Sequence, residues 1–371
     1  MWSRTDIIKG EEVFIFKIFG KEGIVLIPRL EPKEIKTRRL TVSYLEKGEE
    51  HDKLLVLIHG NTSSNVFYLD TIERLSAEFH VLAPDLRGYG FTERLPIDAT
   101  QGLRGWSEDL HAFFEALSLT KKPHLLGWSM GGGVIVQYAL DHADNVASLI
   151  LVNPLPPYGY SGTREDGTPN NPSYSGTGGG TVNVNFVKAL AEKDISAENP
   201  FSVPNVLKNY FAPGFVLEQE WIDLFVDSMT RMGIGEDYYP GDFLPCAEWP
   251  HMAPGTRGIG NAMSRKYVDL SGIVNLPEKP PLLWIRGAKD AIVSDTCLLD
   301  IGYLGKLGYV PGWPGDEVYP PHAMIAQSRR VFEEYRRNGG VSEEYVFENA
   351  GHGPMVEAPQ EFCDVVSSFI R

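Results

Sequence analysis

Runs of apolar residues alternate with helical patterns along most of the chain. The run Lys53–Ile58 is apolar after its first residue and ends at His59-Gly60, as expected of a central strand covered on both faces. The segment Trp106–Leu117 has the apolar spacing of a helix, with Ser107 as an N-cap-like residue. Further apolar runs are His80–Ala83, Pro123–Leu126, Ser148–Val152, Pro281–Ile285 and Glu344–Phe347. This alternation predicts an α/β fold in which helices cover both faces of a mostly parallel sheet.

Two segments near the start of the chain have a different pattern. In Glu12–Ile27 and in Arg39–Leu45, β-branched and aromatic residues alternate with polar ones. Such alternation predicts half-buried antiparallel strands at the edge of the sheet.

The alternation of strands and helices stops after Asn153. About 125 residues follow, up to about Pro280, without the signal of a buried strand, which is too long for a connection inside a compact sheet. We therefore predict a core domain in two parts, residues 1–153 and 281–371, with an inserted and mainly helical cap over 154–280. Helical patterns in the cap cover Val184–Lys193, Ser202–Phe211 and Leu217–Met232.

Two irregular segments are predicted as well. Gly159–Thr181 is rich in small and polar residues, which indicates a long loop or hinge, with an unstructured spacer as the alternative. A second insertion, about 294–321, carries several glycines and prolines and should form one wall of a pocket. The aromatic residues of Tyr238–Trp249 form either a small core of the cap or the roof of that pocket.

The net charge of the chain is −15, which argues against binding to nucleic acid or to an anionic membrane. Its densest basic group, Lys36-Thr37-Arg38-Arg39, is typical of a solvated face. Cys246, Cys297 and Cys363 are too few for a disulfide framework and lack metal-binding spacing. With no signal peptide and no apolar stretch of membrane-spanning length, we expect a cytoplasmic protein without metal or other cofactor, and a homodimer is left open.

The turn Gly127-Trp128-Ser129-Met130-Gly131 carries the strongest chemical signal. It follows a predicted strand and precedes the helical run Gly132–Leu140, and a glycine on either side of the serine permits a tight, strained turn. A serine in that place projects from the carboxyl edge of the sheet at the amino end of a helix. Ser129 is therefore the candidate nucleophile, with a structural turn serine as the alternative.

A serine hydroxyl needs a base and a carboxylate that orients the base. His352 stands in the glycine-rich segment Asn349–Pro354, after the last predicted strand, whereas His59 is better placed to shape a turn. Asp290 follows the strand that ends at Ile285, so it reaches the same sheet edge, and Asp295 is a weaker substitute. The chain order serine, aspartate, histidine results.

Acyl transfer also needs donors for an oxyanion, and two fixed backbone N–H groups serve best. The N–H of Met130, directly after the nucleophile, is one candidate. The other is the N–H of Asn61 in the segment His59–Ser64, which we call the oxyanion loop. Trp128 and Trp249 are candidate substrate contacts.

These motifs resemble the α/β-hydrolase superfamily over about Arg39 to Arg371, apart from the two insertions. The branch concerned contains esterases, lactonases, carbon–carbon hydrolases, epoxide hydrolases and haloalkane dehalogenases. The resemblance implies an eight-stranded sheet, and the segment Pro84–Gly90 looks like that branch's Asp-x-Arg-Gly-x-Gly loop, whose arginine, here Arg87, is usually structural. Asn61 is similar to a halide-holding asparagine of the dehalogenases. Those enzymes use an aspartate nucleophile, however, and attack by Ser129 would leave a stable ether, so dehalogenation is excluded.

The leading hypothesis is hydrolysis of a carboxylic ester or lactone of a mainly apolar or aromatic small molecule through an acyl-enzyme. One alternative is cleavage of a carbon–carbon, amide or carbamate bond by the same triad. Another is a ligand receptor on a hydrolase scaffold.

Overall fold

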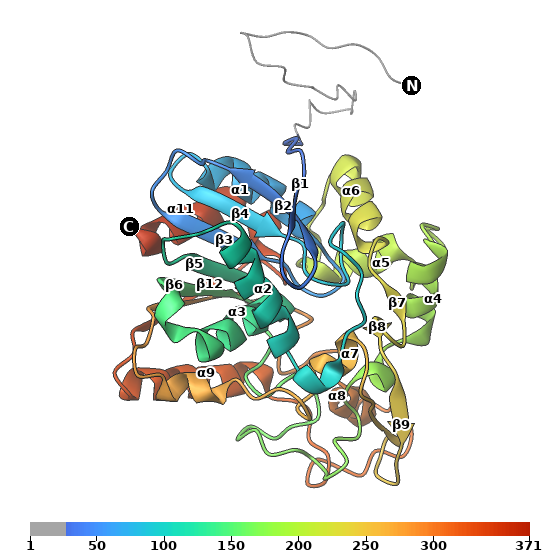
Figure 1. Cartoon of the computed structure of the whole chain (residues 1–371). Coiled ribbons are helices and arrows are strands. Elements are labelled where there is room, and N and C mark those ends of the chain that lie inside the picture. Colours follow the sequence, from blue (N-terminus) through green and yellow to red (C-terminus); the bar gives the residue numbers. More distant parts are fainter. Residues whose placement is uncertain (1–26) are drawn as a thin grey trace.

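The computed structural model describes residues 27–371, and its centre is one eight-stranded sheet (Figure 1). In spatial order the strands are β1 (Lys33–Lys36), β2 (Thr41–Lys47), β4 (His80–Pro84), β3 (Leu54–Ile58), β5 (His124–Trp128), β6 (Ser148–Val152), β11 (Leu282–Gly287) and β12 (Ser342–Phe347). β2 pairs antiparallel with both β1 and β4, and all other pairs are parallel. The predicted mostly parallel sheet is confirmed.

The central strands are apolar on both sides because helices cover both faces. All five residues of β3 are buried, and so are all five of β6. The helices of the core are α1 (Leu69–Leu75), α2 (Arg104–Ala116), α3 (Met130–Asp141), α9 (Met324–Arg337), α10 (Pro354–Glu357) and α11 (Pro359–Ile370). Figure 1 shows α1 and α11 on one face and α2, α3 and α9 on the other.

Two details at the start of the chain differ from the sequence prediction. The edge strand is β1, which lies in a segment that shows no clear alternation, while the predicted strand Glu12–Ile27 lies outside the described residues except for Ile27. β2 is antiparallel as predicted, but it is covered on both faces rather than half-buried. On one face Tyr44 packs on Phe113 of α2 at 5.2 Å between ring centres, and on the other Ser43 and Leu45 are also buried.

Ser107 is not the N-cap of α2. The helix begins three residues earlier, at Arg104, and the Ser107 hydroxyl donates to Asp141 of α3 at 2.9 Å. The serine therefore joins two neighbouring helices. Ser107 looks like an N-cap in the sequence because acidic residues follow it. Acidic residues can follow a serine inside a helix as well as one at the helix start.

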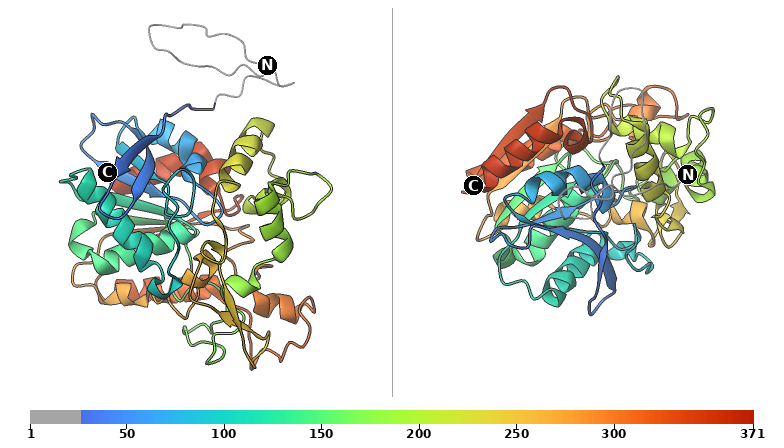
Figure 2. Two further views of the ribbon diagram at one scale, coloured as in Figure 1. Left: turned by 45° about the vertical axis from the view of Figure 1, so that its right-hand side comes forward. Right: turned by 90° about the horizontal axis from the view of Figure 1, so that it is seen from above.

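The segment 154–280 contributes no strand to the eight-stranded sheet. Its helices are α4 (Val184–Glu192), α5 (Val203–Leu207), α6 (Gln219–Met229) and α7 (Ile259–Ala262), and α4, α5 and α6 lie beside the sheet (Figures 1 and 2). It also contains two small two-stranded sheets, made by β7 (Ile234–Gly235) with β8 (Tyr239–Pro240) and by β9 (Phe243–Pro245) with β10 (Met252–Pro254). Those strands are too short to give a signal in the sequence. We keep the name cap for this segment.

The second insertion is irregular apart from one helix, α8 (Ile301–Lys306). A buried polar cluster ties it to the glycine-rich start of the cap. The backbone N–H of Ser161 donates to His322 Nδ1 at 2.9 Å, and the Ser161 hydroxyl donates to Asp300. These contacts show that the segment beginning at Gly159 is a packed loop rather than a spacer.

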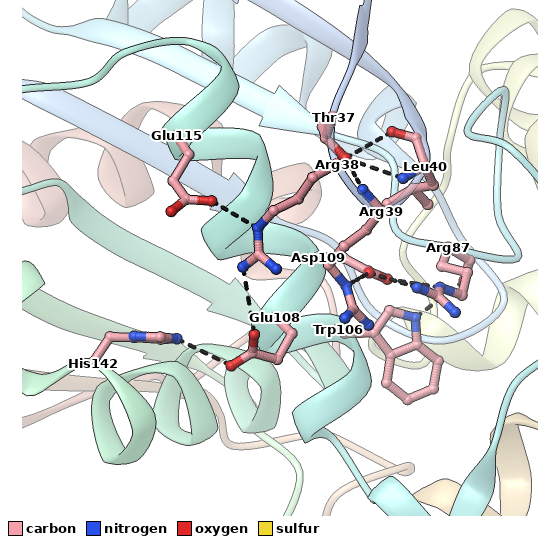
Figure 3. Close-up of polar contacts among 10 residues, drawn as sticks. All are labelled: Thr37, Arg38, Arg39, Leu40, Arg87, Trp106, Glu108, Asp109, Glu115 and His142. Carbon is pink, nitrogen blue, oxygen red and sulfur yellow. Dashed lines mark hydrogen bonds and ion pairs between the residues drawn. The ribbon is translucent and has the colours of Figure 1, made fainter.

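The arginine of the Pro84–Gly90 loop is structural, as the resemblance implied. Figure 3 shows Arg87 and Arg39 pointing at the same carboxylate, that of Asp109 on α2. Arg87 binds both of its oxygens, at 2.7 and 2.6 Å, and Arg39 binds one at 2.6 Å. The indole of Trp106 donates to the Arg87 carbonyl at 3.1 Å. Arg39 is thus engaged in a mostly buried ion pair, whereas Arg38 lies on the solvated face with Glu115.

No helix within residues 27–371 is both long and apolar enough to cross a membrane. The three cysteines are free thiols, of which Cys297 and Cys363 are buried.

Candidate active site

Ser129 stands on the strained turn between β5 and α3. Its backbone has φ 56° and ψ −122°, a region that residues with a Cβ rarely adopt. The glycines beside it are required by space: a Cβ on Gly127 would lie 2.4 Å from the Gly131 carbonyl oxygen, and one on Gly131 would lie 2.2 Å from that of Ile58. The turn that the sequence predicted is therefore present, and it brings Ser129 to the carboxyl edge of the sheet.

His352 and Asp290 meet at that edge. The Nδ1 atom of His352 lies 2.8 Å from Asp290 Oδ2, and both side chains are only 2% exposed. The other oxygen of Asp290 accepts the backbone N–H groups of Ile292 at 2.7 Å and of Val293 at 3.0 Å. These two donors fix the carboxylate, so one oxygen is left to face the imidazole.

The His352 loop is held against the Ser129 turn by residues that the sequence did not identify for this role. The indole N–H of Trp128, next to the serine, donates to the His352 carbonyl at 2.7 Å. The Asn153 amide donates to the same carbonyl at 2.8 Å and accepts the N–H of Gly287 at 3.0 Å. Trp128 is fully buried, and its hydrogen bond supports the histidine loop.

The two expected oxyanion donors belong to segments that adjoin the serine, since Met130 follows it in the chain and Asn61 follows Gly60 in the oxyanion loop. A Cβ on Gly60 would lie 2.8 Å from the Cβ of Ser129, so the oxyanion loop passes directly beside the nucleophile. In the described part of the chain, the backbone N–H groups of Asn61 and Met130 donate to no protein acceptor. Both are therefore available for a ligand.

The side chain of Asn61 is already engaged by a tyrosine. Its Oδ1 accepts the hydroxyl of Tyr89 at 2.8 Å, and the Tyr239 hydroxyl lies near the Asn61 amide. Tyr89 is on the Pro84–Gly90 loop and Tyr239 is on β8 of the cap. This engagement orients the loop and supports the backbone N–H, rather than the amide side chain, as the group that meets a substrate.

Trp249 lies in a different surrounding. Its indole N–H donates to the Pro311 carbonyl at 2.8 Å, and its ring packs edge-on against Tyr319 at 4.8 Å between ring centres. Trp249 thus joins the cap to the second insertion. Among the cap aromatics, Tyr239 lies near the oxyanion loop, whereas Phe243 is 57% exposed. The aromatic residues of Tyr238–Trp249 therefore do not form one common core or one pocket roof.

His59 shapes the turn after β3, as expected. Its Nε2 accepts the backbone N–H of Leu86 at 3.0 Å, so its Nδ1 carries the proton and donates to the Gly60 carbonyl at 2.8 Å. Burial lowers the pKa of this imidazole to about 4. The neutral ring is the form that fits both contacts.

Acidification is therefore expected to destabilise the fold through His59. In the unfolded chain the imidazole titrates near its ordinary pKa of about 6.5, so its stabilising contribution is complete above that pH and is lost as the pH falls towards 4. The gap between the two pKa values corresponds to about 3 kcal/mol. Urea denaturation at pH 7.5, 6 and 4.5 should show a smaller decrease for His59→Gln than for the wild type. Equal decreases in both proteins would contradict this role.

Comparison with known sequences identifies relatives of this chain. The model of the Alpha/beta hydrolase family matches residues 55–365. The chain is 34% identical over 105 residues to Monoacylglycerol lipase ABHD6 of Homo sapiens, which is 28% of this chain and 31% of the relative. It is 28% identical over 138 residues to Cis-3-alkyl-4-alkyloxetan-2-one decarboxylase of Xanthomonas campestris, 34% of this chain and 46% of the relative. The match thus spans less than half the length of these curated relatives.

Solved structures share the fold over almost the whole chain. A putative aryl esterase from Burkholderia cenocepacia superposes with a TM-score of 0.57 at 18% identity, covering 92% of this chain and 98% of its own. That identity speaks for the fold alone. Together with the family match over most of the sequence, it leads to one conclusion: the chain belongs to the alpha/beta hydrolase family.

Proposed function

We propose that this protein is a serine hydrolase that cleaves a carboxylic ester or lactone of a mainly apolar or aromatic small molecule. The observation that carries the proposal is the buried pair of His352 and Asp290, 2.8 Å apart, on a loop fastened to the turn that presents Ser129. A buried imidazole with its Nδ1 on a fixed carboxylate is the arrangement that a serine nucleophile needs.

The reaction proceeds in two halves. The hydroxyl oxygen of Ser129 attacks the carbonyl carbon while His352 Nε2 takes its proton, and the imidazole then passes that proton to the leaving oxygen. In the second half, water attacks the acyl-enzyme with the same assistance. The backbone N–H groups of Asn61 and Met130 stabilise the oxyanion in each tetrahedral intermediate. Asp290 holds the imidazole in the required tautomer and stabilises its cation.

The substrate class is argued from the surroundings and the relatives. Large aromatic side chains, among them Tyr210 and Tyr239 from the cap, are buried around the oxyanion loop. The curated relatives' names include a monoacylglycerol lipase, and one names an oxetan-2-one, which is a four-membered lactone. An ester or lactone with an apolar acyl or aryl group fits both.

A substrate panel tests this proposal. We expect turnover of p-nitrophenyl butyrate and of an aromatic lactone at rates at least about 100-fold above buffer, since a positioned nucleophile and oxyanion donors act on both. A meta-cleavage diketone and an anilide serve as the competing substrates in the same assay. Turnover of the diketone with complete indifference to esters would replace the proposal by carbon–carbon hydrolysis. Absence of all turnover would favour the receptor interpretation.

A further inference from the structure

Tyr210, a residue of the cap, contacts both the oxyanion loop and the loop that carries His352. It ends a short 3₁₀ turn, Lys208–Tyr210, in the cap, and it is 6% exposed. Its ring packs edge-on against Trp128, with ring centres 6.0 Å apart, and against His352 at 6.2 Å. This cap residue thus packs on Trp128, which precedes the nucleophile in the chain, and on His352, the candidate base.

The backbone of this cap segment holds the histidine loop. The Tyr210 carbonyl accepts the N–H groups of His352 at 2.8 Å and of Gly353 at 3.1 Å. Two residues further on, the N–H of Ala212 donates to Glu357 Oε1 at 2.6 Å, and the other oxygen of that carboxylate accepts the N–H of Gly351 at 2.7 Å. Three successive residues of the loop are therefore fastened by the cap or by a carboxylate that the cap shares.

The hydroxyl of Tyr210 holds the oxyanion loop. It is hydrogen-bonded to the Thr62 hydroxyl and lies 3.4 Å from the Thr62 carbonyl oxygen. Thr62 has φ 47°, a left-handed conformation that is unfavourable for a β-branched residue and that persists only where the surroundings impose it. The side chain of the preceding Asn61 is held as well, because its Oδ1 accepts the hydroxyl of Tyr89 at 2.8 Å.

We propose that Tyr210 is a positioning residue for the reaction. Its hydroxyl fixes the conformation of Thr62, and hence the direction of the Asn61 N–H, while its carbonyl fixes the backbone of His352. One cap residue thereby sets the oxyanion donor and the base relative to each other. This inference rests on the proposed function, because the oxyanion loop matters only where Ser129 attacks a carbonyl group.

The variant Tyr210→Phe separates the two contacts, since it removes the hydroxyl and keeps the ring and the carbonyl. We expect kcat for p-nitrophenyl butyrate to fall about tenfold or more, because a displaced donor loses its contact with the transition state. The KM should stay within about twofold, as the ground state makes little use of that donor. The acid limb of the pH dependence of kcat should not move, because the bonds to the His352 backbone remain.

Thr62→Val removes the partner hydroxyl at similar shape and should reproduce the loss. The double variant should be no slower than either single one, since the two hydroxyls form one contact. Tyr335→Phe is the matched control, because Tyr335 is also a buried residue and its hydroxyl donates to a backbone carbonyl, that of Pro280, at 2.5 Å. It should lower thermal stability about as much and leave kcat unchanged.

A wild-type kcat in Tyr210→Phe would overturn the positioning role, as would losses in the two single variants that multiply in the double variant. A shift of the acid limb would place the effect on His352 and would overturn it as well. Failure of the proposed function is recognised separately, because the wild type would then hydrolyse none of the panel.

Discussion

Replacement of Ser129 by alanine is expected to lower kcat for ester hydrolysis about 10⁵-fold or more, because no acyl-enzyme can form without the hydroxyl. The fold should persist. Alanine keeps the Cβ that the turn already accommodates at φ 56°, and only the hydroxyl oxygen is removed. The measurement is the steady-state rate with p-nitrophenyl butyrate, together with a thermal unfolding curve for each protein.

Ser118→Ala is the matched control for this variant. Ser118 also has a positive φ, of 53°, but it is exposed in the turn after α2. It should retain the wild-type rate. A Ser129→Ala protein that kept a tenth of the activity would show that another group is the nucleophile.

Replacement of Asp290 by asparagine is expected to lower kcat about 10⁴-fold, because it forces the wrong tautomer on His352. Oδ1 of the aspartate accepts two backbone N–H groups, those of Ile292 and Val293. An asparagine must place its oxygen there, so its NH₂ group turns towards His352 Nδ1. That nitrogen then has to accept, the proton moves to Nε2, and the imidazole can no longer take a proton from Ser129.

The comparison variant is Asp295→Asn, which changes the weaker candidate acid. Asp295 Oδ1 accepts the N–H of Ile325 at 2.7 Å and does not contact the histidine. Its kcat should stay within about threefold of the wild type. If Asp295→Asn were the slower of the two variants, the assignment of Asp290 as the partner of His352 would be wrong.

The sequence predicted the part of this structure that depends on local pattern. The runs Lys53–Ile58 and Pro123–Leu126 became β3 and β5 because a strand covered on both faces must be apolar at every position. Ser129 could be identified since its turn needs glycines at fixed offsets on both sides. His352 and Asp290 could be paired because parallel strands end at the same edge of the sheet.

What the sequence did not predict depends on contacts between distant segments. Tyr210 and Tyr239 occur in a cap whose aromatic residues all look alike in the sequence, and only the folding of that cap onto the oxyanion loop separates them from the exposed Phe243. The role of Asn153 was hidden for the same reason. It follows β6 without being a carboxylate, yet its amide bridges Gly287 and the histidine loop.

Covalent labelling with a serine-directed fluorophosphonate, followed by mapping of the modified peptide, tests the central claim most directly. We expect one adduct per chain, on Ser129, formed by the wild type and absent from Ser129→Ala. Formation should be strongly slowed in Asp290→Asn, because the hydroxyl is then no longer activated. An adduct on another residue of a protein that hydrolyses esters would contradict the account, and so would the absence of any adduct from the active wild type.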